Sequence, residues 1–343
     1  MKSSLMMNET QLQAENAAIR QKIAGARRVL IVSHIRPDGD AIGAMLGLGQ
    51  ALENNGKEVK MVLADGVPLA LRYLPGSEAI ERAVPVETLA KFDLAILVDC
   101  SDLQRSGGVL GERIPDVNID HHITNPNFAE VNLVIPAQAA TSAIIAEYLP
   151  AWGLAINQTI ASNLLTGIVT DTIGFRTSNM TSGILRLAAM LMDHGADLPE
   201  LYTRALISKS FEAARYWGTG LRKVRRVELS GAGSYVWTTL TLADRKEANY
   251  PGNDDADLVN LLSAIDSDLA VLFIEQKNSH VKVSWRARPG IDVSKIALQF
   301  GGGGHPSAAG ADIAGSLDTV QERVLDSTQD MLTIALQNKN IPA

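Results

Sequence analysis

The sequence is poor in cysteine, in long apolar runs and in positive charge, and each shortage excludes a class of protein. Its 343 residues include a single cysteine, Cys100, which excludes a disulfide framework and a zinc site built from cysteines. No apolar run approaches the roughly 20 residues that a membrane-spanning helix needs. The first residues are polar and helix-prone and lack the apolar core of a signal peptide. We therefore expect a cytoplasmic protein with no membrane partner.

Charge and composition narrow the class further. The chain has 31 Lys and Arg against 38 Asp and Glu, a formal net charge of −7, which argues against binding long duplex nucleic acid through a broad basic surface. A small anionic substrate stays compatible with this charge, because carboxylates that hold divalent cations reverse the local field. The hydrophobic share of 46% is typical of a globular protein, and the length suffices for two domains.

Strand-like and helix-like segments alternate in the first half of the chain. Short apolar runs rich in β-branched residues predict strands at 27–34, 57–65, 92–102 and 116–122. Helical periodicity appears at 41–54, 139–149 and 158–170. Strands that alternate with helices indicate an α/β fold, a mostly parallel sheet flanked by helices.

The second half has a different pattern. Residues 182–226 are helical and increasingly charged, and the strands expected after them alternate polar and apolar residues more regularly, which favours partly antiparallel pairing. A terminal helix is expected from 317 to 338. We therefore predict an α/β domain joined by a helical connector to a smaller α+β domain. The expected boundaries are 1–185, 186–222 and 223–343.

Several predicted strands of the first domain end in acidic or histidine residues. In an open parallel sheet the carboxyl ends of the strands share one edge, and ligands bind there. Residues far apart in the sequence would therefore meet in space. Asp171 follows the apolar helical segment at 158–170 and could reach the same edge. The candidates are His34, Asp38, Asp40, Asp99, His121 and Asp171.

This set of side chains points to divalent cations. Carboxylates within a few Å of one another repel strongly unless cations neutralise them. Oxygen and imidazole ligands without thiolate suit Mn²⁺, with Mg²⁺, Co²⁺ and Zn²⁺ as alternatives. Two such ions close together can clamp a phosphoryl group for in-line attack.

Each residue also has an ordinary structural explanation. Asp40 would cap the helix that follows it, and Asp38 would occupy a Pro-Asp-Gly turn. Asp99 would be a loop acid, His34 a polar residue at a strand end, and Asp171 the cap of a turn. The joint occurrence of these residues at corresponding strand ends is what favours a metal site.

The motifs, taken in order, resemble those of the DHH phosphoesterases. HIRPDGDAIG is similar to their first motif, LVDCSD to the second, IDHH to the third and GIVTDTIGF to the fourth. Downstream, VKVSWRAR followed by FGGGGHPSAAGA resembles the DHH-associated C-terminal domain. The chain is most similar to the NrnA-type short-chain oligoribonucleases, the nano-RNases that also act on pAp.

The resemblance implies a ligand set for two cations that matches the candidates found from charge and position. One cation would be held by His34, Asp38 and Asp99, and Asp99 would bridge to the other. The second cation would be held by Asp40, Asp99, His121 and Asp171.

The resemblance also separates the two adjacent histidines. His122 would face the substrate and either bind the scissile phosphate or protonate the leaving oxygen. Asp120 would orient one of the two histidines. Because adjacent strand residues point to opposite faces, alternation supports a metal role for His121 and a substrate role for His122.

The second domain carries candidate phosphate ligands. Consecutive glycines let backbone N–H groups approach an anion, and His305 follows them directly; the alternative is a flexible loop. The planar guanidinium of Arg286 suits bidentate phosphate binding, although it could equally be an exposed strand cation. If this domain binds substrate, the substrate would lie between the two domains. The candidates are Ser284, Arg286, Gly302, Gly303, Gly304 and His305.

The activity implied by the resemblance is that of a manganese-dependent hydrolase. It would degrade short RNA oligonucleotides to mononucleotides and convert pAp to AMP, with a hydroxide that bridges the cations attacking phosphorus. A phosphodiesterase acting on linear or cyclic dinucleotides, such as pApA or c-di-AMP, is the alternative within this class. A catalytically inactive nucleotide-binding sensor is the alternative outside it. Whether the chain forms a homodimer is left open.

Overall fold

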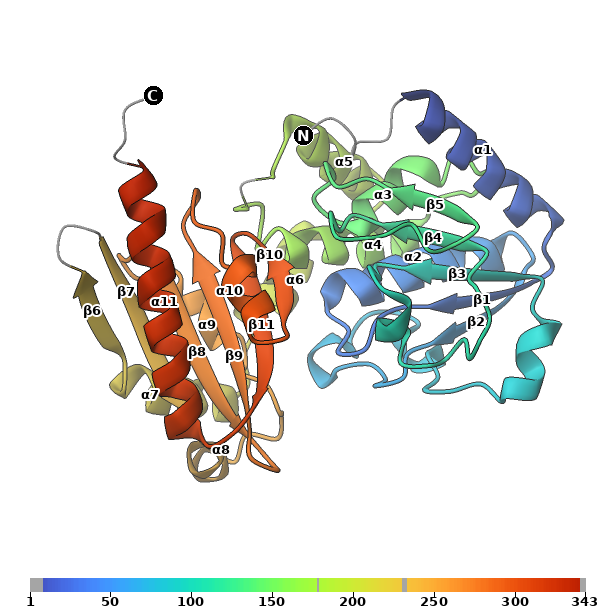
Figure 1. Cartoon of the computed structure of the whole chain (residues 1–343). Helices are drawn as coiled ribbons and strands as arrows, with labels where there is room; N and C mark the ends of the chain where they lie inside the picture. The colour runs from blue at the N-terminus through green and yellow to red at the C-terminus, as the bar shows by residue number, and fades with distance from the viewer. Residues whose placement is uncertain (1–8, 178, 230–232, 340–343) are drawn as a thin grey trace. The chain divides into compact units, whose positions relative to one another are not determined.

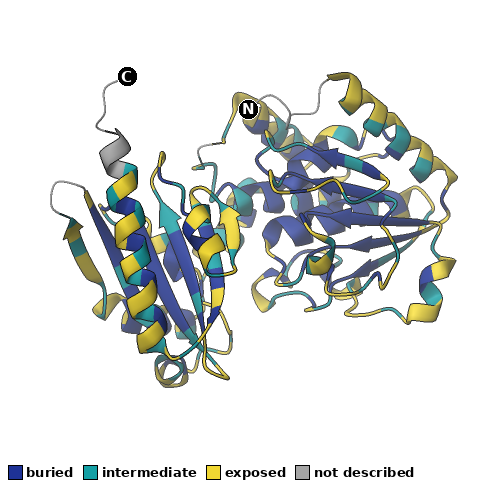
Figure 2. Ribbon diagram, in the orientation of Figure 1, coloured by how far each residue is buried: buried dark blue, intermediate teal, exposed yellow. Residues whose placement is uncertain are grey.

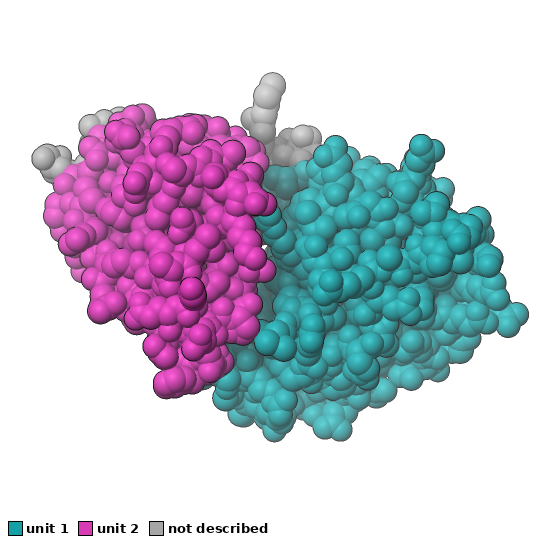
Figure 3. Space-filling view, turned by 90° about the horizontal axis from the view of Figure 1, so that it is seen from below, with its two compact units in different colours: residues 1–208 teal, residues 209–343 magenta. Residues whose placement is uncertain are grey.

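The computed structural model describes residues 9–339 except 178 and 230–232. The chain divides into two compact units, Met1–Ser208 and Lys209–Ala343 (Figure 3). Among the described residues, no helix combines the length and the apolar character needed to cross a bilayer.

The helical segment expected as a connector is divided between the two units. Helices α5 (Ser182–Asp193) and α6 (Leu198–Tyr202) belong to the first unit, and α7 (Phe211–Arg222) belongs to the second. The reason is that their apolar faces enter different cores. Ile184 of α5 is buried in the core of the first unit, and Tyr216 of α7 is buried in that of the second.

The first unit is built on a five-stranded sheet with the order β2-β1-β3-β4-β5, in which every pair of neighbours is parallel (Figure 1). The predicted parallel α/β fold is confirmed. Strand β5 was not predicted, because its short sequence VNLV gives too few residues for a pattern. The strands are β1 (Arg28–Val32), β2 (Glu58–Val62), β3 (Leu94–Val98), β4 (Val117–Asp120) and β5 (Val131–Val134).

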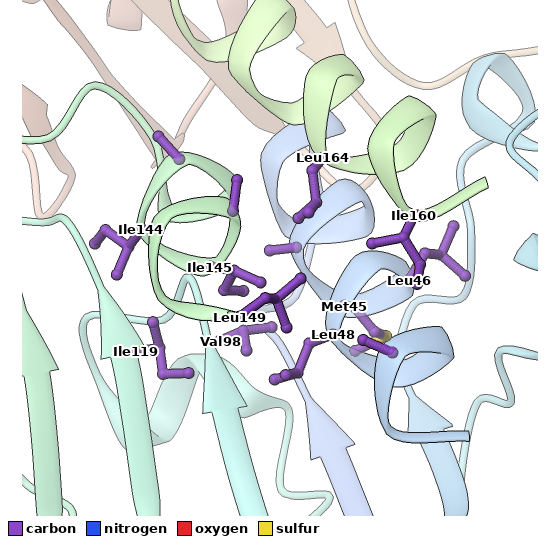
Figure 4. Packing of buried hydrophobic residues seen from close by; sticks show 14 of the residues in the cluster. Met45, Leu46, Leu48, Val98, Ile119, Ile144, Ile145, Leu149, Ile160 and Leu164 are labelled. Atoms are coloured by element: carbon purple, nitrogen blue, oxygen red, sulfur yellow. The ribbon is translucent and has the colours of Figure 1, made fainter. Parts of the chain in front are cut away.

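Helices α2 (Gly39–Asn54), α3 (Thr141–Tyr148) and α4 (Gln158–Asp171) cover one face of this sheet. Val98 and Ile119 of the sheet point into the apolar layer that these helices form (Figure 4). The burial of apolar strand and helix faces in this layer is the main source of stability in such a fold.

The opposite face of the sheet is covered by shorter segments. Leu30, Val32 and Leu97 of the strands pack there with Leu89 and with the buried Cys100. The 3₁₀ segments of the unit are Leu69–Leu71, Ser77–Ala79, Val86–Lys91 and Leu103–Ser106, and a π-helical turn covers Thr203–Ile207. Helix α1 (Glu9–Gly25) lies against the edge strand β5 (Figure 1).

Helices α2 and α4 approach each other closely because α2 carries glycines at the contact. A Cβ atom at Gly43 would lie 2.5 Å from the backbone oxygen of Asn163 and 3.0 Å from the backbone nitrogen of Gly167. Only glycine therefore fits at this point without separating the helices. The contact sets the distance between the N-terminus of α2 and the C-terminus of α4, where candidate site residues lie.

The second unit is built on a six-stranded mixed sheet with the order β10-β11-β9-β8-β7-β6. Strands β7 and β8 are parallel and the other neighbours are antiparallel, as the alternating patterns predicted in part. The strands are β6 (Arg225–Leu229), β7 (Gly233–Leu240), β8 (Leu269–Gln276), β9 (His280–Ala287), β10 (Gly303–His305) and β11 (Ala308–Ala314).

Both faces of this sheet are covered by helices, so its central strands are buried (Figure 2). One face packs with α10 (Ser294–Gln299) and α11 (Leu317–Lys339) around Trp285. The other packs with α7, α8 (Leu242–Ala248) and α9 (Leu258–Leu262) around Tyr216. Each unit thus has a core of its own.

Candidate metal centre

The structure brings the predicted ligands together at the carboxyl ends of the parallel strands. His34 follows β1, Asp99 follows β3, and the segment Asp120-His121-His122 lies at the end of β4. The remaining acids come from the start of α2 and the end of α4. The candidate ligand atoms form two groups, each with its members within 4.8 Å of one another. The groups are His34, Asp38 and Asp99, and Asp40, His121 and Asp171.

Asp99 lies between the two groups. Its Oδ2 is 3.4 Å from Nε2 of His34, and its Oδ1 is 3.7 Å from Nε2 of His121. The residue has a φ of +52°, in the left-handed region, and its side chain is buried. A residue held in this sparsely populated conformation points to a local constraint on the side chain. The geometry is that of a carboxylate able to bridge two cations.

The two candidate imidazole ligands present the same nitrogen to the site. Nδ1 of His34 lies 2.8 Å from the carbonyl oxygen of Ile35, and Nδ1 of His121 lies 3.4 Å from that of Gln138. A carbonyl accepts a hydrogen bond from a protonated nitrogen, so both rings donate from Nδ1 and direct Nε2 toward the carboxylates of the site. A backbone carbonyl behind a histidine is the usual arrangement for a metal ligand.

As the alternative to a metal ligand, Asp40 was predicted to cap the helix that follows it, α2, but the structure shows a different cap. The residue that caps this helix is Asp38, whose Oδ1 accepts hydrogen bonds from the backbone N–H groups of Asp40 and Ala41 at 3.0 and 3.1 Å. Asp40 lies inside the first turn. Its Oδ2 accepts from the N–H of Thr141 at 2.6 Å and its Oδ1 from that of Ser142 at 2.9 Å. Asp40 therefore serves the N-terminus of α3 and not that of its own helix.

The carboxylates of the site carry more negative charge than the protein alone accommodates. Burial and the charge of Asp99 raise the pKa of Asp40 to about 7. Burial and the charge of Asp40 raise the pKa of Asp171 well above its ordinary value. Asp99 differs: burial opposes ionisation, but the hydrogen bond with His34 and the charges of the histidines hold its pKa far below the usual range. A donor set of this charge and chemistry fits divalent cations.

The structure overturns the alternation argument for the two histidines. Strand β4 ends at Asp120, so the alternation of a strand does not reach His121 and His122. Both rings turn to the same side: their centroids are 4.8 Å apart, and a ring nitrogen of each lies within 3.8 Å of Oδ1 of Asp99. Strand geometry therefore does not separate their roles.

The two histidines differ instead in the hydrogen-bond partners of their Nδ1 atoms. Nδ1 of His122 lies 2.7 Å from Oδ1 of Asp120, whereas Nδ1 of His121 faces a backbone carbonyl. Asp120 is fully buried, and its Oδ2 accepts a hydrogen bond from Asn125 at 2.6 Å. Burial favours the neutral ring, but the hydrogen bond and charge of Asp120 outweigh it and raise the pKa of His122.

In the second unit, four of the six candidate substrate residues lie in two rows across the sheet, and the row that contains Gly304 runs between these two. Arg286 of β9 pairs with Ala308 of β11, which pairs with His305 of β10. The second of these rows joins Ser284, Gly310 and Gly303 in the same way. Side chains at directly paired positions share a face. The structure therefore brings these candidates together on one face of the sheet.

Arg286 is not the exposed cation that its alternative explanation requires. Burial lowers the pKa of its guanidinium, while Asp255 and Asp257 act in the opposite direction. Its Nη1 donates to the carbonyl of Trp285 at 3.0 Å, and its buried Nε has no hydrogen-bond partner among the described residues.

The glycine run is not the open loop with unused N–H groups that the sequence suggested. The N–H of Gly301 donates to the carbonyl of Leu298 at 3.1 Å and that of Gly302 to the carbonyl of Ala297 at 2.8 Å, which ends α10 in a Schellman motif with Gly301 at φ +73°. The following residues form edge strand β10. The N–H of Gly302 is therefore occupied and does not contribute to an anion nest.

Some residues that organise the site were not predicted. Thr141 and Ser142 donate to Asp40, and Asn125 donates to Asp120. The signal present in the sequence is a Thr-Ser pair at the start of a predicted helix. That pattern ordinarily indicates only a helix terminus.

A parallel α/β domain whose strand ends gather carboxylates and imidazoles, followed by a mixed-sheet domain, defines a class: a two-domain phosphoesterase. The chain belongs to the DHH family, with residues 28–168 matching the DHH family N-terminal domain and residues 235–333 matching the DHHA1 domain.

Relatives and a solved structure agree with this family. The chain is 38% identical to the bifunctional oligoribonuclease and PAP phosphatase NrnA of Thermus thermophilus, over 90% of this chain and 91% of that protein. It is 29% identical to the protein of the same name in Mycoplasma genitalium, over 91% and 95%. The crystal structure of an exopolyphosphatase-related protein from Bacteroides fragilis shares the fold, with a TM-score of 0.82, 24% identity and coverage of 93% and 98%.

Proposed function

We propose that this phosphoesterase degrades very short RNA to mononucleotides and converts pAp to AMP. The observation that carries the proposal is the convergence of the six predicted ligands in two adjacent groups at one sheet edge. The substrates are those named for NrnA, to which the chain is similar over most of its length.

The proposed cofactors are two divalent cations, most suitably Mn²⁺. When bound, they would supply an activated water and stabilise the negative charge that develops at phosphorus. Asp99 would face both ions, since its two carboxylate oxygens face different ligand groups. The first ion would be held by His34, Asp38 and Asp99, and the second by Asp40, Asp99, His121 and Asp171.

His122 is proposed as the catalytic residue that contacts the substrate, with Asp120 as its positioning residue. The hydrogen bond from Nδ1 to Asp120 orients the ring and leaves Nε2 as the nitrogen that exchanges a proton with the substrate. Because Asp120 raises the pKa of His122, the ring is suited to donate a proton to the leaving oxygen near neutral pH.

The second unit is proposed to bind the nucleotide. Arg286 carries a guanidinium whose Nε has no partner among the described residues, and such a group favours a phosphate. His305 lies in the same cross-strand row, and Ser284 in the second row. Gly303 and Gly304 would contribute through the backbone of edge strand β10.

A time course of products tests the proposed function. The substrates are a 5′-labelled RNA dinucleotide and tetranucleotide, with pAp, pApA, c-di-AMP and pyrophosphate in parallel, each with Mn²⁺ and with a chelator. We expect Mn²⁺-dependent release of mononucleotides from the RNA and of phosphate from pAp. Turnover of pApA or c-di-AMP alone would replace the proposal with a dinucleotide phosphodiesterase.

Asp99→Asn distinguishes an enzyme from a nucleotide sensor. The substitution removes the charge that both ligand groups share, so hydrolysis should be abolished. Asp102→Asn is the matched control, because Asp102 is exposed and its Oδ1 accepts from the N–H of Gln104 at 2.7 Å, a bond that asparagine preserves. If the unaltered protein is as inactive as the Asp99→Asn variant and still binds a nucleotide tightly, the sensor explanation is correct.

A further inference from the structure

Thr141, the first residue of α3, contacts both candidate ligand groups of the first unit. Its backbone N–H donates to Oδ2 of Asp40 at 2.6 Å, and its Oγ1 donates to Oδ1 of Asp99 at 2.9 Å. Asp40 comes from α2 and Asp99 from the end of β3. One residue therefore fixes carboxylates that arrive from two separate elements.

The local structure of α3 explains why Thr141 is free to make this contact. The residue before it, Ala140, has no side chain that could cap the helix. The first N–H groups of α3 are directed to the carboxylate of Asp40 instead, Thr141 to Oδ2 and Ser142 to Oδ1. The first turn of the helix is thus tied to a carboxylate of the site, and the Thr141 side chain is held beside Asp99.

The hydroxyl of Thr141 acts on the oxygen of Asp99 that faces the second ligand group. Oδ1 of Asp99 also lies 3.7 Å from Nε2 of His121, while Oδ2 faces His34. A donor at Oδ1 fixes the rotation of the carboxylate, and this rotation decides whether each oxygen faces its own group. The threonine side chain is well suited, because it is fully buried and its β-branch restricts χ1.

We propose that Thr141 is a positioning residue for the metal centre. Its side-chain hydroxyl holds the carboxylate of Asp99 in the orientation that faces both ligand groups, and its backbone N–H holds Asp40. It is not a ligand, since its hydroxyl proton is directed to Asp99. The inference rests on the proposed function, because it assigns a role toward cations that the proposed function requires. Groups of this kind behind a metal ligand typically change metal affinity by about 10- to 100-fold.

The test compares Mn²⁺ binding by the full chain in several variants. Thr141→Val keeps the shape and the backbone N–H but removes the hydroxyl, and Thr141→Ser keeps the hydroxyl. Thr166→Val is the matched control: Thr166 is also fully buried, but its Oγ1 donates to the carbonyl of Ser162 in its own helix at 2.9 Å. Calorimetry gives the affinities, and electron paramagnetic resonance distinguishes a coupled Mn²⁺ pair from isolated ions.

We expect Thr141→Val to bind at least one Mn²⁺ about 10- to 100-fold more weakly and to lose the signal of the coupled pair. Thr141→Ser should restore both, and Thr166→Val should match the unaltered protein. Should Thr141→Val not fold, Thr141→Ala replaces it, with the same result expected against Thr141→Ser. Equal losses in Thr141→Val and Thr166→Val would show an effect of packing and overturn the proposal.

Failure of this inference is distinguishable from failure of the proposed function. If the unaltered protein binds Mn²⁺ and cleaves short RNA while Thr141→Val binds both ions with unchanged affinity and spectrum, the positioning role is wrong and the function stands. If the unaltered protein neither binds Mn²⁺ nor cleaves any substrate tested, the proposed function is wrong, and the role of Thr141 is overturned with it.

Discussion

His121 and His122 follow the same strand and turn to the same side, yet their Nδ1 atoms have different partners. The partner of His121 is a neutral carbonyl, whereas that of His122 is the buried carboxylate of Asp120. A carboxylate stabilises a charged ring more than a carbonyl does, so His122 is better suited to carry a proton. Nε2 of His121 also lies 3.6 Å from Oδ2 of Asp171, within the second ligand group.

Separate alanine variants of the two histidines test this division at the scale of one residue. His121→Ala removes a predicted ligand and should weaken Mn²⁺ binding by about 10-fold or more. His122→Ala should bind Mn²⁺ normally and lose about 100-fold or more in kcat, because it removes a proton donor. Calorimetry and steady-state kinetics on an RNA dinucleotide measure the two effects. The assignment is reversed if His122→Ala loses the metal and His121→Ala keeps it.

The raised pKa of Asp40 predicts how the stability of the metal-free protein depends on pH. Asp40 binds its proton more tightly in the folded chain, with a pKa of about 7, than at its ordinary value of 3.8. The contribution of Asp40 to the free energy of unfolding is therefore fully present below pH 3.8 and is lost as the pH rises through about 7. His34, His121 and His122 also have raised pKa values, and they act with the same sign at higher pH.

Urea unfolding of chelator-treated protein at pH 5 and pH 7.5 measures this loss. We expect a decrease in the free energy of unfolding on the order of 2–4 kcal/mol, larger in the unaltered protein than in Asp40→Asn, which does not titrate. Asp40→Asn removes the titration of Asp40 and also the charge that raises the pKa values of His121 and Asp171, so the difference between the two proteins reports Asp40 together with its interactions with these two groups. Saturating Mn²⁺ should stabilise the unaltered protein more at pH 7.5 than at pH 5. Equal pH dependence in both proteins contradicts the prediction.

At the scale of elements, the contact between α2 and α4 couples packing to the site. α2 carries Asp40 near its start and α4 carries Asp171 at its end, so the helix spacing at Gly43 sets the distance between these two acids. A side chain at Gly43 would meet backbone atoms of α4, which cannot rotate away as a flexible side chain would. Relief therefore requires the helices to separate.

Gly43→Ala should destabilise the protein by about 1–3 kcal/mol and weaken Mn²⁺ binding, despite the better helix propensity of alanine. Gly25→Ala is the control in the same unit, because a Cβ atom at Gly25 would meet nothing within 4 Å among the described residues. It should change stability by less than about 0.5 kcal/mol and leave metal binding unaltered. Urea unfolding and calorimetry measure the two quantities. A neutral Gly43→Ala would show that α2 and α4 have room to separate at no cost.

The elements that were predictable from the sequence are those with a clear apolar pattern, such as β1, β3 and α2. Two strands were harder: β5 is short, and β6 has the sequence RRVEL, whose charges hide its pattern. The residue types of the metal centre were predictable because acids and histidines are unusual at buried strand ends. The role of Thr141 was not, because a threonine at a helix start has the same appearance whether it caps a helix or contacts Asp99.

Two errors came from applying a local rule beyond the end of its element. Strand alternation was extended to His122, although β4 ends at Asp120. The predicted phosphate nest was extended to Gly302, although the N–H groups of Gly301 and Gly302 cap α10. In both cases the position of the element boundary, set by tertiary pairing, decides what the residues do.

At the scale of the whole molecule, the chemistry and the proposed substrate binding belong to different units. Every predicted metal ligand lies in Met1–Ser208, and the candidate substrate ligands Ser284, Arg286 and His305 lie in Lys209–Ala343. Each unit has buried cores of its own, so each contains the apolar packing that independent folding requires. Metal binding and substrate binding should therefore be separable.

A fragment of residues 1–208 tests this separation. It should bind Mn²⁺ with an affinity close to that of the full chain and slowly cleave bis(p-nitrophenyl) phosphate, an activated diester that needs little binding. Its kcat/KM on an RNA dinucleotide should fall on the order of 100-fold or more, because the interactions that hold the nucleotide in the transition state are absent. Asp99→Asn in the same fragment is the control and should abolish the slow cleavage. If the fragment instead cleaves the dinucleotide at the full-chain rate, substrate recognition resides in the first unit, and the role proposed for Arg286 is wrong.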